Sequence, residues 1–166
     1  MISKMRKKAE QSVQLMYDSV IRKIDQEEGS NGLIILQALY GKLPPSDLVA
    51  ARLLTPQGIK NIGDLAKESF KRALSDVDDT PVSAIPEKYI SVRIAIQALV
   101  SNSQLHIRGE NSKSTILGFY DPCMGEKKRL RVTYQFQGRI HQVEVDDKAP
   151  LAAPLRGHFV NLAHLV

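Results

Sequence analysis

Apolar residues recur every three or four positions at the start of the chain. They form one stripe along residues 3–28, made of Ala9, Val13, Met16, Val20 and Ile24. This spacing predicts an amphipathic helix that ends at the Gly-Ser-Asn-Gly run of residues 29–32. Most such stripes pack on their own domain. The same spacing also suits a partner helix, and its candidate contact face is Val13, Met16, Val20 and Ile24.

Continuous and alternating apolar runs follow the helix. Residues 33–40 are apolar on nearly both faces, which predicts a strand covered on each side. Residues 89–99 alternate apolar and polar positions and predict a second strand, and residues 104–108 predict a short third strand. Between the first two strands, residues 42–88 form an insertion punctuated by five prolines, with helical spacing at 59–75.

Two further alternating runs predict a β-hairpin with a defined register. Residues 129–136 and 139–146 flank Gln137-Gly138, which we expect to form a two-residue turn, although glutamine disfavours positive φ. This register places apolar residues opposite apolar residues and a positive charge opposite a negative one. Its pairs are Leu130 with Val145, Val132 with Val143, Tyr134 with His141, Arg131 with Glu144 and Thr133 with Gln142.

Together these segments predict an α+β fold. An N-terminal helix leads into a small, mainly antiparallel sheet or sandwich of about five strands, with a helical insertion after the first strand. We divide the chain into an N-terminal helix (1–31), a β domain (32–158, insertion 42–88) and an apolar tail (159–166) that we expect to dock on the core.

Composition narrows the class of protein. The chain has 166 residues, is 43% hydrophobic and contains one cysteine, so an internal disulfide is excluded. Its apolar runs are far shorter than the roughly 20 residues of a membrane span. The formal charge of +5 comes largely from the first eight residues and from a candidate basic patch formed by Lys127, Lys128, Arg129 and Arg131. These residues could contact phosphates or acidic lipid head groups, but aromatic residues are not interleaved among them, so nucleic acid is not expected.

Residues with catalytic potential are few. The histidines at positions 106, 141, 158 and 164 show no metal-ligand spacing, and we expect no metal or cofactor. An enzyme would have to use Cys123 with His141 or Asp121, which requires these groups to be adjacent in space. His141 is better explained as a core histidine, and Cys123 as an inert thiol.

Three segments resemble one known family. Residues 118–147 (GFYDPCMGEKKRLRVTYQFQGRIHQVEVDD) closely follow the GFYDPC, YQF-x-G and HQV pattern of the C-terminal domain of DnaJ homolog subfamily C member 11 proteins. Residues 9–41 resemble the helix and strand that open that domain, and residues 90–105 resemble its middle strand and the "LV-x-x-S-x-L" continuation. The insertion at 42–88 is longer than the resemblance leads one to expect.

The resemblance implies a non-catalytic protein-interaction or scaffold domain. Full-length family members begin with a J domain whose His-Pro-Asp tripeptide stimulates a chaperone ATPase. That tripeptide is absent here, so no co-chaperone activity is carried over. Members accompany complexes that organise mitochondrial cristae, which implies mitochondrial protein partners and a peripheral membrane contact. The candidate interaction loop is Gly118, Phe119, Tyr120, Asp121, Pro122 and Cys123. The alternative is a soluble, cytosolic chaperone-associated factor that binds clients or partners.

Overall fold

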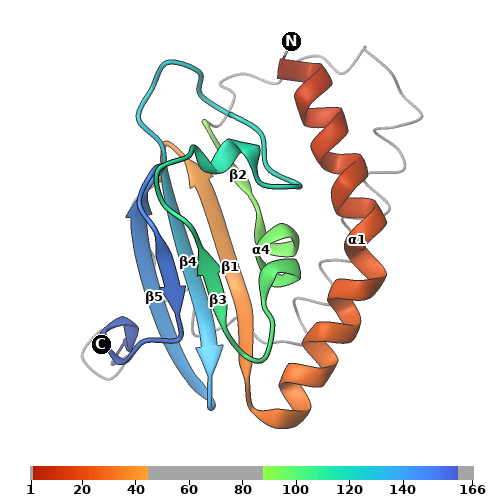
Figure 1. The fold of residues 1–166 in the computed structure, drawn as a ribbon, viewed down its shortest axis with the longest axis vertical. Helices are drawn as coiled ribbons and strands as arrows, with labels where there is room; N and C mark the ends of the chain where they lie inside the picture. The colour runs from red at the N-terminus through yellow and green to blue at the C-terminus, as the bar shows by residue number, and fades with distance from the viewer. Residues whose placement is uncertain (1, 45–87, 161–166) are drawn as a thin grey trace.

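The computed structural model describes residues 2–44 and 88–160. Two α-helices, α1 (Ile2–Ser30) and α4 (Arg93–Leu99), accompany six strands in this part of the chain (Figure 1). The strands are β1 (Leu33–Gly41), β2 (Tyr89–Ser91), β3 (Leu105–Ile107), β4 (Arg129–Phe136), β5 (Arg139–Asp146) and β6 (Leu151–Ala153). Two short 3₁₀ helices, η1 (Lys113–Thr115) and η2 (Arg156–His158), lie in the connections.

The strands form two antiparallel sheets. The larger sheet has the order β2-β1-β4-β5, and β3 pairs with β6 in a second, two-stranded sheet. Figure 1 shows α1 running beside α4 and β1, at the side of the larger sheet. The structure therefore confirms the predicted α+β class with a mainly antiparallel sheet.

The β4–β5 hairpin has the predicted register. Tyr134 pairs with His141, and all the other predicted pairs are present as well. The two turn residues both have positive φ, 53° at Gln137 and 75° at Gly138, as a primed two-residue turn requires. Cross-strand matching of side chains thus outweighed the poor fit of glutamine to the turn.

Strand β1 is buried on both faces, as predicted. On one face, Leu33 and Ile35 belong to the main core, which also contains residues of β3, β4, β6 and α4. On the other face, Ile34 and Leu36 pack against Val20 of α1. A register shift between Ile35 and Gln37 interrupts strict alternation, so Ala38 and Tyr40 belong to the main core together with Leu33 and Ile35.

The apolar stripe of α1 is occupied by the domain itself. Val20 and Ile24 are fully buried against β1, while Val13 and Met16 lie near Gly118 in the loop that precedes β4. The stripe therefore packs on its own domain, which is the first of the two predicted alternatives, and Val20 and Ile24 are not available to a partner helix. The stripe packs inward because β1 presents a complementary second apolar face.

The prediction of one strand over residues 89–99 is also wrong. Only Tyr89–Ser91 is a strand, and Arg93–Leu99 forms a helix. The alternating isoleucines are compatible with a strand and also with this helix. In the helix, Ala95 and Ile96 face the main core and Ile94 packs beside α1. Tertiary packing here overrides the preference of β-branched residues for strands.

Polar side chains hold α4 in place. The amide of Gln97, which the alternating pattern assigned to a polar face, is completely buried. Its Oε1 accepts the Ile35 N–H at 2.7 Å and its Nε2 donates to the Leu33 carbonyl at 3.3 Å, so it pairs with β1 much as a neighbouring strand would. Lys23 of α1 donates to the carbonyls of Ala98 and Val100 at the C-terminal end of α4.

Two features of the connections were not predicted. Strand β6 lies between Pro150 and Pro154 and pairs with the predicted third strand. The two ends of the insertion are adjacent, because Gly41 pairs with Tyr89 and the Lys42 N–H donates to the Lys88 carbonyl at 3.0 Å. The predicted helix at 59–75 and most of the tail lie outside the described residues.

Candidate functional site

The 117–128 loop, which contains the GFYDPC sequence, connects η1 to β4 and lies against both helices. Gly118 has φ +94°, and a Cβ atom added there would lie 2.9 Å from the Ala95 Cβ and 3.3 Å from the Val13 Cγ2. Only glycine permits both this backbone conformation and this approach. The loop is thus positioned by direct contact between its backbone and the helices.

Two further contacts anchor the loop to the end of β1. Phe119 is 5% exposed, and its ring lies 5.2 Å from that of Tyr40, measured between centroids. Pro122 packs on the backbone of Gly41, where a Cβ atom would lie 2.8 Å from the Pro122 Cγ. These residues act as anchors, and burial removes Phe119 from the surface.

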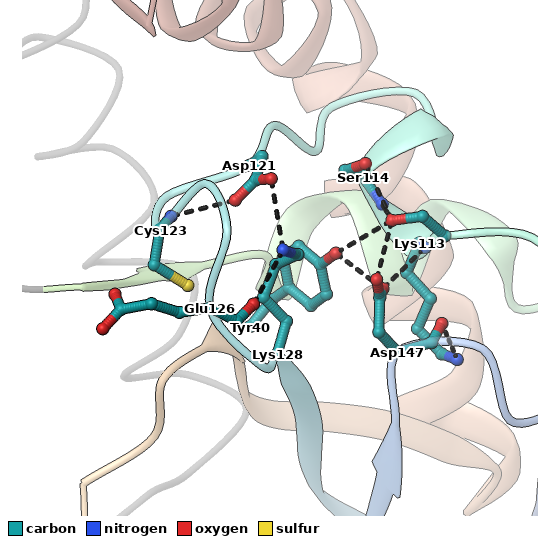
Figure 2. A network of polar contacts seen from close by, with 9 residues as sticks. Tyr40, Lys113, Ser114, Asp121, Cys123, Glu126, Lys128 and Asp147 are labelled. Atoms are coloured by element: carbon teal, nitrogen blue, oxygen red, sulfur yellow. Dashed lines mark hydrogen bonds and ion pairs between the residues drawn. The ribbon is translucent and has the colours of Figure 1, made fainter.

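Asp121 organises the tip of the loop (Figure 2). Its Oδ1 accepts the backbone N–H of Cys123 at 2.9 Å, and its Oδ2 pairs with the ammonium of Lys128 at 3.2 Å. Lys128 also donates to the carbonyl of Glu126 at 3.1 Å. Because the side chain of Lys128 is only 11% exposed, solvent screens this ion pair less than a surface pair.

A second polar cluster lies beside the loop and is centred on Asp147. The Tyr40 hydroxyl donates to Oδ1 at 2.6 Å, the Ser112 hydroxyl donates to Oδ2 at 2.8 Å, and the Lys113 N–H donates to Oδ1 at 2.8 Å (Figure 2). Burial by itself would raise the pKa of Asp147, but these hydrogen bonds outweigh it and the pKa is lowered. The ionised carboxylate is therefore the stable form in the fold.

The side chain of Lys113 completes this cluster. It is 1% exposed, and its ammonium donates to the carbonyls of Asp146, Asp147 and Ala149 at 3.0, 2.9 and 2.5 Å. Burial lowers the pKa of Lys113, and the charges of Asp147 and Asp146 partly oppose this effect. All three ammonium hydrogens have acceptors, so Lys113 joins η1 firmly to the turn after β5.

The surroundings of Cys123 do not favour nucleophilic chemistry. Burial raises the pKa of its thiol, which stabilises the protonated form, whereas a nucleophilic cysteine needs a lowered pKa. Asp121 is already engaged by the Cys123 N–H and Lys128, and His141 lies in a separate aromatic cluster with Tyr134. Among the described residues, no group of three His, Cys, Asp or Glu side chains could hold a metal ion.

The exposed part of the 117–128 loop differs from the predicted interaction loop. Phe119 and Cys123 are buried, at 5% and 6% exposure, and Gly118, Pro122 and Asp121 contact other parts of the domain. Tyr120 is partly buried, and burial raises its pKa. The exposed large apolar side chains directly flank the GFYDPC residues: Leu117 is 67% exposed and Met124 is 59% exposed.

The predicted basic patch is largely neutralised. Arg129 pairs with Glu144 at 2.7 Å and with Asp146, and Arg131 pairs with Glu144 at 2.9 Å while donating to the Pro44 carbonyl at 2.7 Å. Burial would raise the pKa of Glu144, but hydrogen bonds from both arginines lower it. These contacts follow from the hairpin register, which places the acids opposite the arginines.

The four predicted patch residues therefore do not form one cationic surface. Lys128 is engaged by Asp121, and Lys127 remains exposed. Intramolecular carboxylates pair with Lys128, Arg129 and Arg131, so a contact of this patch with phosphate or lipid stays a prediction. Within the part of the chain that the structure describes, no helix is long and apolar enough to cross a bilayer.

The sequence patterns do not identify the residues of the Asp147 cluster. Tyr40 is the last residue of a predicted strand, and Lys113 and Asp147 lie outside the predicted strands. The only local signal was the placement of Asp147 directly after the predicted strand. Tyr40 and Asp147 are 107 residues apart in the chain, so no local pattern could have paired them.

The fold and the loop define a small α+β domain that holds a surface loop rigidly through internal polar contacts. By sequence comparison the chain belongs to the family described as "DnaJ-like protein C11, C-terminal", whose model matches residues 1–154. The chain is 36% identical to mouse (Mus musculus) DnaJ homolog subfamily C member 11 over 156 residues, which is 94% of this chain and 22% of that protein. It is 35% identical to the Dictyostelium discoideum homolog over 158 residues, or 95% of this chain and 22% of that protein.

A third relative covers less of the chain. An uncharacterised J domain-containing protein of Schizosaccharomyces pombe is 38% identical over 73 residues, which is 44% of this chain and 12% of that protein. No solved structure matches the chain. Since the chain spans about a fifth of the length of its DnaJ relatives (22%), it corresponds to one part of a DnaJ-family protein.

Proposed function

We propose that this chain is a non-catalytic protein-interaction domain that acts as a scaffold in the organisation of mitochondrial cristae membranes. The observation that carries the interaction role is the 117–128 loop: its buried contacts hold it in one conformation while Leu117 and Met124 stay exposed to solvent. A pre-ordered loop loses little conformational entropy when it binds, and exposed apolar side chains on such a loop are typical of recognition surfaces.

Family membership supports the mitochondrial part of the proposal. The resemblance associates members of this family with complexes that organise cristae, and the family model covers residues 1–154 of the chain. The first turns of α1 add the exposed side chains of Lys4 and Lys8, which suit a peripheral contact with acidic lipid. Proteins are the primary partners in this proposal, and the membrane contact is secondary.

The test is affinity purification of the tagged full chain from cells, combined with subcellular fractionation. We expect a mitochondrial protein that recovers membrane-organising partners, and we expect the double variant Leu117→Ser/Met124→Ser to recover at least about tenfold less of them. Leu15→Ser is the matched control, because Leu15 is 87% exposed on α1, and it should leave recovery unchanged. A wholly cytosolic protein, or equal recovery by the double variant, would contradict the proposal.

A further inference from the structure

A cluster of aromatic and histidine side chains joins the C-terminal segment to the β4–β5 hairpin. Tyr134 is fully buried at its centre, with the ring of His141 stacked on it at 4.9 Å between centroids and an interplanar angle of 11°. His158 approaches the edge of Tyr134 at 5.8 Å, and Phe159 approaches the edge of His141 at the same distance. Two imidazoles thus contact one tyrosine, one from the hairpin and one from the C-terminal segment.

The hydrogen bonds of the Tyr134 hydroxyl define the tautomer of His158. The Leu155 N–H donates to the hydroxyl oxygen at 3.1 Å, and the same oxygen lies 2.7 Å from the His158 Nδ1. An amide can only donate, which leaves the hydroxyl proton free for Nδ1. We assign Nδ1 as the unprotonated acceptor, because this arrangement gives the hydroxyl proton a partner. His158 is therefore neutral in this arrangement and carries its proton on Nε2.

His141 has the opposite assignment. Its Nδ1 lies 3.0 Å from the carbonyl of Arg139, and a carbonyl can only accept, so this nitrogen is protonated. The two Nδ1 atoms therefore have different roles: that of His141 donates to a carbonyl, and that of His158 accepts from a hydroxyl. A proton added to His158 at Nδ1 removes the acceptor that the Tyr134 hydroxyl uses.

Protonated His158 would be poorly accommodated. The Tyr134 oxygen would face two donors, and its own proton would lose its acceptor. The titratable groups near His158 are Tyr134 from β4 and His141 from β5. Arg139 lies over the ring of the neighbouring Phe159, and Arg156 belongs to the same 3₁₀ helix as His158. Among the described residues no carboxylate forms an ion pair with His158, and burial together with the nearby His141 lowers its pKa.

Few other contacts hold this segment on the hairpin. Phe159 forms an isolated antiparallel bridge with His141, and the Val160 N–H donates to the Ile140 carbonyl at 3.0 Å. Arg139 lies over the Phe159 ring at 5.7 Å, but Phe159 is 46% exposed. Among the described residues, the Tyr134–His158 hydrogen bond is thus one of a small number of contacts between this segment and the hairpin, and its loss weakens that attachment.

We propose that Tyr134, His141 and His158 form a pH-sensitive latch, which holds the segment Leu155–Val160 on the β4–β5 hairpin while His158 is neutral and releases it when His158 is protonated. Release uncovers the buried ring of Tyr134 and the backbone carbonyl of Ile140 at the outer edge of β5. The latch is independent of the proposed interaction function, because it lies on the hairpin and not on the 117–128 loop.

The test is NMR of the full chain at pH 7.5 and pH 5.5. At pH 7.5 the side-chain nitrogens of His158 should show the Nε2–H tautomer. Hydrogen exchange at the Leu155 and Val160 amides should then lose about tenfold in protection at pH 5.5, after correction for the intrinsic pH dependence of exchange. The hairpin amides of Val132 and Val143 should keep their protection, which distinguishes local release from global unfolding.

Variants separate the latch from general acid sensitivity. Asparagine cannot titrate and can place its carbonyl near the position of Nδ1, so His158→Asn should keep the segment protected at both pH values, whereas His158→Ala should loosen it at both. His106→Asn is the control, because His106 is exposed on β3, and it should respond to pH like the parent chain. An Nδ1–H tautomer of His158 at pH 7.5, or an unchanged pH response in His158→Asn, would overturn the proposal.

Discussion

Two buried tyrosines of the same sheet hold segments in place by hydroxyl hydrogen bonds, but they donate to different kinds of acceptor. Tyr40 on β1 donates to the carboxylate of Asp147, and Tyr134 on β4 bonds to the imidazole of His158, to which we assign it as the donor. Both tyrosines have 0% exposure, so their settings differ mainly in the acceptor. The carboxylate stays ionised over the whole physiological pH range, while an imidazole changes charge near the acidic end of that range. The Tyr40–Asp147 contact is therefore a permanent anchor at physiological pH. The Tyr134–His158 contact is a conditional anchor, because it depends on the protonation state of His158.

Removing the carboxylate of the Tyr40 cluster should have the largest effect. Asp147→Ala leaves the Tyr40 hydroxyl, the Ser112 hydroxyl and the Lys113 N–H without their acceptor. It also removes the charge that opposes the buried ammonium of Lys113. We expect the free energy of unfolding to fall by about 3 kcal/mol, measured by chemical denaturation.

Asp146→Ala is the matched control for this prediction. Asp146 is the preceding residue, its side chain is 74% exposed, and its ion pair with Arg129 is at the surface. The control should change the free energy of unfolding by less than about 1 kcal/mol. If the two variants were equally stable, Asp147 would not be the centre of the anchor.

Removing each tyrosine hydroxyl compares the two anchors directly. Tyr40→Phe loses a hydrogen bond to a charged acceptor, which contributes about 1.5–3 kcal/mol. Tyr134→Phe loses the hydrogen bond to the neutral His158 and the one from the Leu155 N–H, which contribute about 0.5–1 kcal/mol each. Denaturation at pH 7.5 should therefore show the larger loss of stability for Tyr40→Phe. The reverse order would contradict the assignment of a neutral His158.

The two anchors should also differ in their response to acid. The pKa of His158 is lowered in the fold, so the unfolded chain binds more protons below the ordinary histidine pKa of about 6.5. The contribution of neutral His158 to the free energy of unfolding is fully present above about pH 6.5, and it is lost as the pH falls below that value. The pKa of Asp147 is also lowered, so its contribution persists until the pH falls below the ordinary aspartate pKa of about 3.9.

Hydrogen exchange measures this difference within one molecule. Between pH 7.5 and pH 5.5, the Lys113 N–H, which donates to Asp147, should keep its protection, while the Leu155 N–H should lose part of its own. Equal loss at both amides would show that acid loosens the whole domain. That result would remove the distinction between the permanent and the conditional anchor.

Changes at the exposed end of the 117–128 loop should have the smallest effect on stability. Leu117→Ser and Met124→Ser alter side chains that are 67% and 59% exposed, while the buried contacts of the loop remain. We expect each variant to lie within about 0.5 kcal/mol of the parent in chemical denaturation. A larger loss would mean that these side chains support the loop, and would weaken their proposed role in binding.

Hydrophobic periodicity predicts the parts of the fold where a pattern is compatible with a single secondary structure. The α1 stripe and the doubly apolar β1 were recognised from periodicity, and the hairpin register followed because a shift by one residue would reverse the faces of both strands. Residues 89–99 show the limit of this reasoning. Their isoleucines suit a strand and a helix equally, and packing against α1 and the core decided for the helix.

The hydrogen-bond partners of the polar residues can be assigned only from the tertiary structure. Gln97 reaches the backbone of β1 across 62 residues of sequence, and Tyr40 reaches Asp147 across 107. The GFYDPC residues were predicted as a contact surface, yet Phe119 and Cys123 are buried. Hydrophobic periodicity reports which face of a segment is covered, because burial of apolar area is not directional. Hydrogen bonds and ion pairs depend on distance and angle between groups far apart in the chain, and these are set only when the chain has folded.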